Sequence, residues 1–243
     1  MRRLTRTLRP SVDFTSLTFN DVTRRFGRRR ALHHVTFTCE AGQIVAVLGP
    51  NGAGKSTLLS IAATLLTPTA GEVLYGDHSA RDGGAALRAR IGVLGHDLYL
   101  YPELTAAENL AFFARLYGVA DVEAVVAAAL THAALRDRSA EPVSSFSRGM
   151  RQRLALERAL LHSPRLVLLD EPFTGLDETA SGTLRERLLG ARSAGAIVIV
   201  TTHDLESIEQ LVDNAFVLIA GRAEPLRDGP GSLRQRYRSH VVS

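Results

Sequence analysis

The sequence predicts an α/β fold built on a mostly parallel core sheet. The apolar run 44–48 leads through a glycine-rich loop into an apolar segment over 57–66, which is the strand–loop–helix order of a parallel sheet. Residues 166–169 and 197–200 are short runs that are apolar throughout, as expected of strands covered on both faces. Residues 98–162, in contrast, carry mostly helix signals. We therefore expect a covered core sheet with a separate helical subdomain.

Further strands are expected ahead of and beside this core. Residues 12–19 and 32–39 are rich in strand-forming residues and flank a turn at Phe26-Gly27-Arg28. Another strand is predicted at 72–75, and it is expected to end before 81–84, where aspartate and glycine break regular structure.

The helical part begins with a clear start signal. Thr105 and Glu108 have the spacing of a capping box and precede the apolar run 110–117. An alanine-rich helix is predicted over 122–135.

The last third returns to alternating strands and helices, with helices predicted near 178–191 and 205–212 and a final strand at 215–219. From Glu224 onward proline and glycine recur, so no regular structure is predicted there. The predicted organisation is a basic arm (1–10), a main domain (11–228) and a basic tail (229–243).

Composition restricts the class of protein. No apolar run in the 243 residues approaches the ~20 needed to span a bilayer, and the basic start lacks the apolar core of a secretory signal. The single cysteine, Cys39, cannot form an internal disulfide, which fits a reducing cytoplasm. A net charge of +4 permits nucleic acid or an anionic membrane as a partner, but the arginines cluster in 2–9, 24–30 and 227–238, two of which are terminal. Nucleic acid is therefore not the expected partner.

The most specific motif is a phosphate-binding loop, which fits the pattern of glycine, four residues and Gly-Lys-Ser. Its residues are Gly49, Pro50, Asn51, Gly52, Ala53, Gly54, Lys55, Ser56 and Thr57. Glycines let successive backbone N–H groups point inward at phosphates, and the helix N-terminus adds partial positive charge. Lys55, the only lysine in the chain, is expected to reach the terminal phosphates, and the Ser56 hydroxyl is expected to bind Mg2+.

Two strand ends carry candidate catalytic groups. Asp170 and Glu171 end the apolar run 166–169, where one carboxylate can hold Mg2+ through water and the next can accept a proton from the attacking water. His203 follows the run 197–200, where it can hydrogen-bond the terminal phosphate. For Asp170 and Glu171 the alternative is an ordinary acidic turn before a proline. For His203 the alternative is a histidine without chemical function.

A second phosphate site is conceivable at Ser147 and Gly149, which lie just before a helix predicted over 154–161. Taken alone, this pair is better explained as an ordinary helix N-cap.

Taken together, these motifs resemble the nucleotide-binding subunits of ABC transporters over nearly the whole chain. The motifs occur in the order typical of that family: the phosphate loop, the signature at 146–150, the acidic strand at 166–171, the segment that ends at Asp177, and finally His203. The resemblance implies a P-loop ATPase fold with an antiparallel N-terminal β subdomain, and it places Phe26 against adenine.

The resemblance also implies partners. Two such subunits pair head to tail, so that ATP and Mg2+ bound by one phosphate loop are capped by Ser147 and Gly149 of the other, with Asp177 at the interface. Hydrolysis and release of the nucleotide reopen the pair, and integral membrane subunits convert this motion into transport. The implied location is the cytoplasmic face of the inner membrane, where the subunit is peripheral and residues 96–110 face the membrane partner.

The sequence departs from the usual motifs of this family at two places. The signature Leu-Ser-Gly-Gly-Gln is replaced by Phe-Ser-Arg-Gly-Met at 146–150, which keeps Ser147 and Gly149. His96 replaces the usual glutamine, and because Mg2+ prefers oxygen, His96 is expected to act through water. His96 and the run 104–110 are similar to the ATPase of the haem exporter used in cytochrome c maturation. Drug and polysaccharide exporters share the run 104–110.

Two other functions compete with an exporter ATPase. One is a non-transport ABC ATPase acting on DNA or ribosomes, which the basic composition favours. Against it, the chain has no long heptad insertion and only one cassette. The other is an ATP-binding module without turnover, against which the presence of Glu171 and His203 argues.

Overall fold

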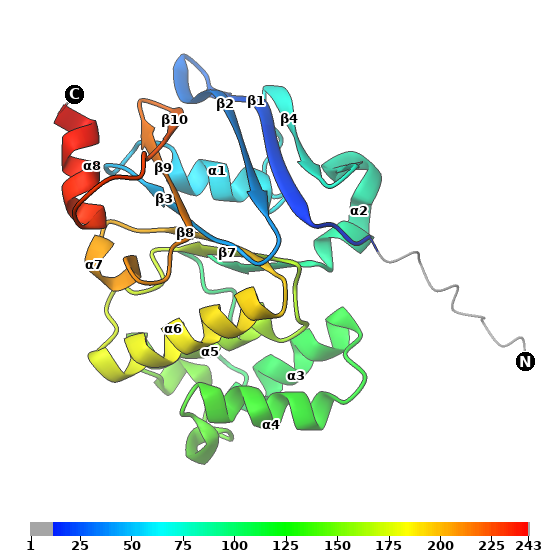
Figure 1. Ribbon diagram of the computed structural model, residues 1–243. Helices are drawn as coiled ribbons and strands as arrows, with labels where there is room; N and C mark the ends of the chain where they lie inside the picture. The colour runs from blue at the N-terminus through cyan, green and yellow to red at the C-terminus, as the bar shows by residue number, and fades with distance from the viewer. Residues whose placement is uncertain (1–11, 243) are drawn as a thin grey trace, which may run out of the picture.

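The computed structural model describes residues 12–242, which are organised by two β-sheets (Figure 1). The smaller sheet is antiparallel, with the strand order β2-β1-β4-β5. Its strands are β1 (Ser16–Phe26), β2 (Arg29–Glu40), β4 (Ala70–Tyr75) and β5 (His78–Ser79). The β1–β2 hairpin turns at the predicted position, after Phe26.

The larger sheet has the strand order β10-β9-β3-β8-β7-β6. All of its neighbouring pairs are parallel except β10 with β9. Its strands are β3 (Ile44–Leu48), β6 (Ile91–Leu94), β7 (Leu166–Asp170), β8 (Ile197–Thr201), β9 (Asn214–Ile219) and β10 (Arg222–Pro225). The predicted fold class, a mostly parallel core sheet with an antiparallel N-terminal sheet, is confirmed.

Helices cover both faces of the core sheet, while α3 and α4 belong to the helical subdomain. The helices of the described residues are α1 (Lys55–Ala62), α2 (Ala80–Arg88), α3 (Ala106–Tyr117), α4 (Val122–His132), α5 (Arg148–Leu160), α6 (Glu178–Ser193), α7 (Leu205–Ile208) and α8 (Leu233–Val242). Short 3₁₀ turns at Arg136–Arg138 and Val143–Ser145 connect α4 to α5.

The central strand β3 shows why the sheet must be covered twice. Val45 and Val47 pack in one core cluster with α1 and the antiparallel sheet. Ile44, Ala46 and Leu48 pack in another with α5 and α6. Successive strand side chains point to opposite faces, so a run that is apolar throughout needs an apolar layer on each side.

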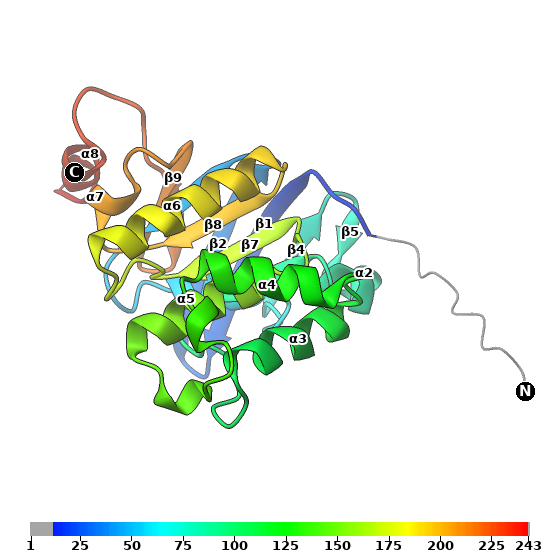
Figure 2. The same ribbon diagram turned by 90° about the horizontal axis from the view of Figure 1, so that it is seen from below.

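The helical subdomain has its own core. Leu110 and Phe113 of α3, Leu130 of α4 and Leu154 of α5 share one cluster, and Figure 2 shows these three helices grouped together. The predicted capping box is confirmed: Glu108 N donates to Thr105 Oγ1 at 3.1 Å, and Thr105 N donates to Glu108 Oε2 at 2.8 Å.

The strand predicted at 72–75 ends before 81–84, as expected, but 81–84 lie in helix α2, which the sequence does not predict. Ser79 caps this helix by accepting a hydrogen bond from Asp82 N at 3.2 Å. Gly84, with φ +50°, kinks the helix without ending it. Buried Leu87 anchors its second half in the main core.

The prediction of no regular structure after Glu224 is wrong for β10 and for α8. Leu233 is buried in the cluster shared with α5 and α6, and Tyr237 packs against it. Arg234 donates to Glu206 at 2.6 Å. Long-range packing thus stabilises a helix that local sequence signals do not predict. The predicted N-terminal arm, 1–10, lies outside the described residues.

Within residues 12–242, no helix is both long and apolar enough to cross a membrane.

Candidate active site

The phosphate loop lies between β3 and α1, and two of its glycines are required by close backbone contacts. A Cβ on Gly49 would lie 2.3 Å from the carbonyl oxygen of Leu218. A Cβ on Gly54 would lie 2.4 Å from the carbonyl oxygen of Ala31, and its φ of +112° also disfavours a side chain. Any larger residue at either position would displace the loop. Helix α1 begins at Lys55, two residues before the predicted start.

The lysine of the loop is held inside it. Lys55 is only 7% exposed. Its Nζ donates to the carbonyl oxygens of Gly49 at 2.8 Å and Pro50 at 3.2 Å. A buried ammonium needs such acceptors, and these neutral carbonyls can be exchanged for phosphate oxygens.

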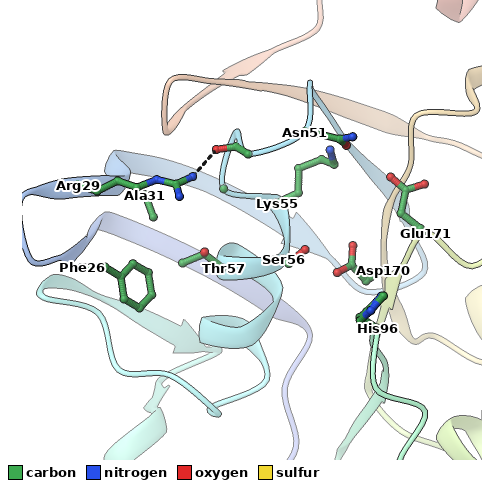
Figure 3. A pocket seen from close by; sticks show the side chains of 12 residues that line it. Phe26, Arg29, Ala31, Asn51, Lys55, Ser56, Thr57, His96, Asp170 and Glu171 are labelled. Atoms are coloured by element: carbon green, nitrogen blue, oxygen red, sulfur yellow. Dashed lines mark hydrogen bonds between the residues drawn. The ribbon is translucent and has the colours of Figure 1, made fainter.

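A cavity of about 350 Å3 opens beside this loop. Figure 3 shows its side chains, which come from the β1–β2 hairpin, the loop, α1 and the ends of β6 and β7. The lining residues are Phe26, Arg29, Ala31, Asn51, Gly52, Gly54, Lys55, Ser56, Thr57, His96, Asp170 and Glu171. The structure thus gathers the predicted aromatic residue, loop, histidine and carboxylates in one place.

The two carboxylates are positioned by the neighbouring strand β8. Thr201 Oγ1 donates a hydrogen bond to Asp170. The backbone N–H of Glu171 donates to the carbonyl oxygen of Thr201 at 3.0 Å. Glu171 has φ +52°, an uncommon conformation for a residue with a side chain, and it turns the chain immediately after β7. The parallel register of β7 and β8 therefore places both acidic residues at the carboxyl end of β7, beside the end of β8.

Glu171 and His203 form a pair. His203 Nδ1 lies 2.8 Å from Glu171 Oε2, and the backbone N–H of His203 donates to the same oxygen at 3.3 Å. The Glu171 side chain is 27% exposed and that of His203 is 67% exposed, so the histidine lies on the solvent side of the carboxylate. The contact between these two residues was not predicted from the sequence, which placed each at the end of its own strand.

Seven predicted residues do not line this cavity: Gly49, Pro50 and Ala53 of the loop, His203, and Ser147, Gly149 and Asp177. Ser147 caps α5 by accepting from Met150 N at 3.3 Å, and Asp177 caps α6 by accepting from Ala180 N at 2.8 Å. Both are exposed. A Cβ on Gly149 would lie 4.0 Å from the carbonyl oxygen of Gly175, so the starts of α5 and α6 are adjacent.

Sequence reasoning missed Arg29 and Thr201. Arg29 pairs with Phe26 across the hairpin, and Thr201 ends the strand next to β7. The sequence indicates the hairpin turn, but only the strand register distinguishes Arg29 from Arg28 and Arg30. Thr201 follows from strand order, which the sequence does not provide.

A family model described as ABC transporter matches residues 32–174, more than half of the chain. The chain belongs to the ABC transporter family. It is accordingly an ATPase that couples ATP hydrolysis to transport.

Several curated members of this family are similar over most of the chain. The ABC transporter ATP-binding protein NatA of Bacillus subtilis is 36% identical over 212 residues, which are 84% of this chain and 86% of NatA. The Nod factor export ATP-binding protein I of Bradyrhizobium diazoefficiens is 37% identical over 202 residues, 82% of this chain and 66% of that protein. The linearmycin resistance ATP-binding protein LnrL of Bacillus subtilis is 32% identical, with 83% and 65% covered.

Solved ABC structures share the fold. An ATP-binding subunit of an ABC transporter superimposes with a TM-score of 0.82 at 31% identity, covering 94% of each chain. A dimeric ATP-binding cassette in a post-hydrolysis state, bound to ADP and Pi, superimposes with a TM-score of 0.79 at 28% identity, covering 88% of this chain and all of the other.

Proposed function

We propose that the chain is the ATP-hydrolysing subunit of an ABC exporter whose membrane-spanning part is supplied by separate subunits. The observation that carries this proposal is the single cavity that joins the phosphate loop to Asp170 and to the Glu171–His203 pair. The names of relatives such as the Nod factor export protein support the export direction.

The loop supplies the binding groups for the triphosphate. Backbone N–H groups of the loop and of the first turn of α1 meet the phosphates. The Lys55 ammonium exchanges its neutral loop carbonyls for phosphate oxygens, whose negative charge makes them the stronger acceptors. Phe26, 47% exposed at the cavity edge, offers a ring face for adenine.

Mg2+ fits the oxygen donors of this cavity. Ser56 and Asp170 both line it, and Figure 3 draws both facing it. Within residues 12–242, no group of three or more His, Cys, Asp or Glu could hold a metal ion, so Mg2+ would take further ligands from phosphate and water. When bound there, Mg2+ offsets the phosphate charge. His96 also lines the cavity, and its imidazole suits a bond to water better than one to magnesium.

Glu171 is the proposed general base for the attacking water. It follows Asp170 directly, so it lies beside the phosphate end of the site. His203 restrains its carboxylate and, being exposed, can also hold the water or the terminal phosphate.

A second copy of the chain completes the site. Ser147 and Asp177 are exposed at adjacent helix N-termini and lie outside the cavity of their own chain. Adjacent helix N-termini can provide N–H groups for the nucleotide held by another copy. The dimeric post-hydrolysis cassette among the similar structures supports this arrangement.

The membrane subunits are proposed to dock in an apolar groove of about 390 Å3 next to the helical subdomain. Tyr99, Tyr101 and Phe113 line it, and the first two are exposed, within the predicted membrane-facing segment 96–110. Arg158 at its base donates to the carbonyl oxygen of Val93 at 2.6 Å.

For the transported cargo, we propose only its chemical class. Relatives named for Nod factor export and linearmycin resistance support the drug and polysaccharide exporters better than haem export. With membrane subunits as partners, the chain would act at the cytoplasmic face of the inner membrane.

Co-purification of the tagged chain from native membranes tests this function. Integral membrane subunits should be recovered with it, and their identity should separate haem from drug or polysaccharide export. Recovery with nucleic acid or ribosomes, and without membrane proteins, would overturn the exporter assignment. A Tyr99→Asp/Tyr101→Asp variant should lose the membrane subunits and keep ATP binding.

A further inference from the structure

The β1–β2 hairpin places an arginine at the nucleotide cavity. Phe26 and Arg29 are directly paired across the turn formed by residues 27 and 28. Both line the cavity. The cation is therefore held next to the ring on which the adenine is proposed to stack.

The Arg29 side chain reaches the phosphate loop. Its Nη2 donates to the carbonyl oxygen of Gly52 at 3.3 Å, as the dashed line in Figure 3 shows. This is at the long end of hydrogen-bond distances, and the acceptor is neutral. Among residues 12–242, no carboxylate forms an ion pair with Arg29.

Arg29 thus repeats the arrangement of Lys55. Both cations line one cavity, and both donate to carbonyl oxygens of the same loop, Lys55 to Gly49 and Pro50 and Arg29 to Gly52. A phosphate oxygen is a charged acceptor that adds ionic attraction to the hydrogen bond of the guanidinium, whereas the Gly52 carbonyl is neutral. A phosphate entering the cavity would therefore compete successfully with the Gly52 carbonyl.

We propose that Arg29 is a nucleotide-binding residue. It restrains the empty loop through Gly52, and it turns to the phosphate chain when nucleotide binds. Because Arg29 is paired with Phe26, it meets the phosphate nearest the base, which ATP and ADP share. This inference rests on the proposed ATP site and adds a second protein cation to it.

The other hairpin arginines do not share this geometry. Arg24 lies over the Phe26 ring, 4.6 Å from its centroid, and Arg30 contacts His33 at 3.0 Å. Arg28 is exposed in the turn and does not line the cavity. Arg28 therefore serves as a matched control, since its removal takes the same charge from the same hairpin.

Calorimetric titration of the full chain with ATP and with ADP tests the proposal. Arg29→Ala should weaken both nucleotides by the same factor, about tenfold, because one charge-assisted bond is lost. Arg29→Lys should recover part of that loss. Arg28→Ala should change either affinity by less than about twofold, since an exposed charge is largely screened.

The outcomes are distinct. If the Arg29→Ala variant binds ATP and ADP as tightly as the Arg28→Ala variant does, the proposal is overturned. ATP binding by the chain would still stand. A loss confined to ATP would contradict the contact next to the base. A wild-type chain that binds neither nucleotide would instead overturn the proposed function. Thermal unfolding of each variant ensures that the folded protein is being compared.

Discussion

At the scale of single residues, the nucleotide site is prepared by hydrogen bonds between strands and loops. Thr201 fixes Asp170 and the backbone of Glu171, and His203 fixes the Glu171 carboxylate. Each bond joins the end of one parallel strand to the next, so the orientation of the carboxylates depends on strand order rather than on neighbouring sequence.

Glu171→Gln isolates the proposed base, because it keeps the shape of the side chain and removes the proton acceptor. We expect ATP hydrolysis to slow by about 10²–10⁴-fold, with ATP affinity nearly unchanged. Phosphate release measured beside nucleotide binding checks this. Glu186→Gln, an exposed change in the middle of α6, should leave hydrolysis intact. A fully active Glu171→Gln enzyme would remove the base assignment.

The candidate site was largely predictable at this scale because strand ends and the glycine loop have strong local signals. His96, Asp170, Glu171 and six of the nine loop residues line the cavity, and Glu171 also contacts His203. Arg29 was not predicted, since nothing in its own sequence neighbourhood distinguishes it from Arg28 or Arg30. Only the hairpin register does so.

At the scale of elements, a buried ion pair joins α5 to α6. Glu157 of α5 is 2% exposed, and Arg187 of α6 donates to both of its oxygens at 2.8 Å. Burial raises the pKa of the Glu157 carboxyl, and Arg187 opposes this rise. His132 of α4 lies 3.6 Å from the same carboxylate, so three helices meet there.

Arg187→Met should therefore be costly, because it leaves a buried carboxylate without its partner. We expect the free energy of unfolding to fall by about 3–5 kcal/mol. On the same helix, Arg192 forms an exposed pair with Asp213 at 3.3 Å, and Arg192→Met should cost less than about 1 kcal/mol. Urea unfolding of both variants checks this, and equal losses would mean that the buried pair has no special role.

The junction of α5 and β7 should make stability depend on pH. Burial lowers the pKa of His162 to about 4, and its ring stacks on Tyr117 with centroids 3.7 Å apart. Nearby Arg158 and Arg90 lower its pKa further. In the unfolded chain histidine has a pKa near 6.5. The unfolded state thus binds the proton first as pH falls, and stability declines from about pH 6.5 toward pH 4.

Between pH 7 and pH 5 this histidine should account for about 2 kcal/mol of lost stability. Urea unfolding at both pH values measures the decline. His162→Phe keeps an aromatic ring against Tyr117 and should make the decline smaller by that amount. An unchanged decline in the variant would show that His162 does not titrate in this way.

Element prediction succeeded where a run is apolar throughout and failed where long-range packing overrides local signals. The runs around 44–48 and 166–169 were found because every residue in them is apolar. Helix α2 contains two glycines, and α8 follows a segment rich in proline and glycine. Their stabilising contacts, through Leu87 and Leu233, come from residues distant in the sequence.

At the scale of the whole molecule, one chain holds only part of the proposed site. The cavity would hold the nucleotide from one side, while Ser147, Gly149 and Asp177 lie outside it at adjacent helix starts. Burying ATP between two copies would exclude water and strengthen each contact to developing charge. The Glu171→Gln variant, which should bind ATP without hydrolysing it, should therefore accumulate as the ATP-bound dimer.

The molecular mass of the Glu171→Gln chain in solution, measured by light scattering, tests this arrangement most directly. With ADP the mass should be that of one chain, 26.3 kDa, and with Mg-ATP it should double. Adding Lys55→Ala should prevent the doubling, because the triphosphate is no longer held. A mass that stays at 26.3 kDa while ATP is bound would contradict the shared site.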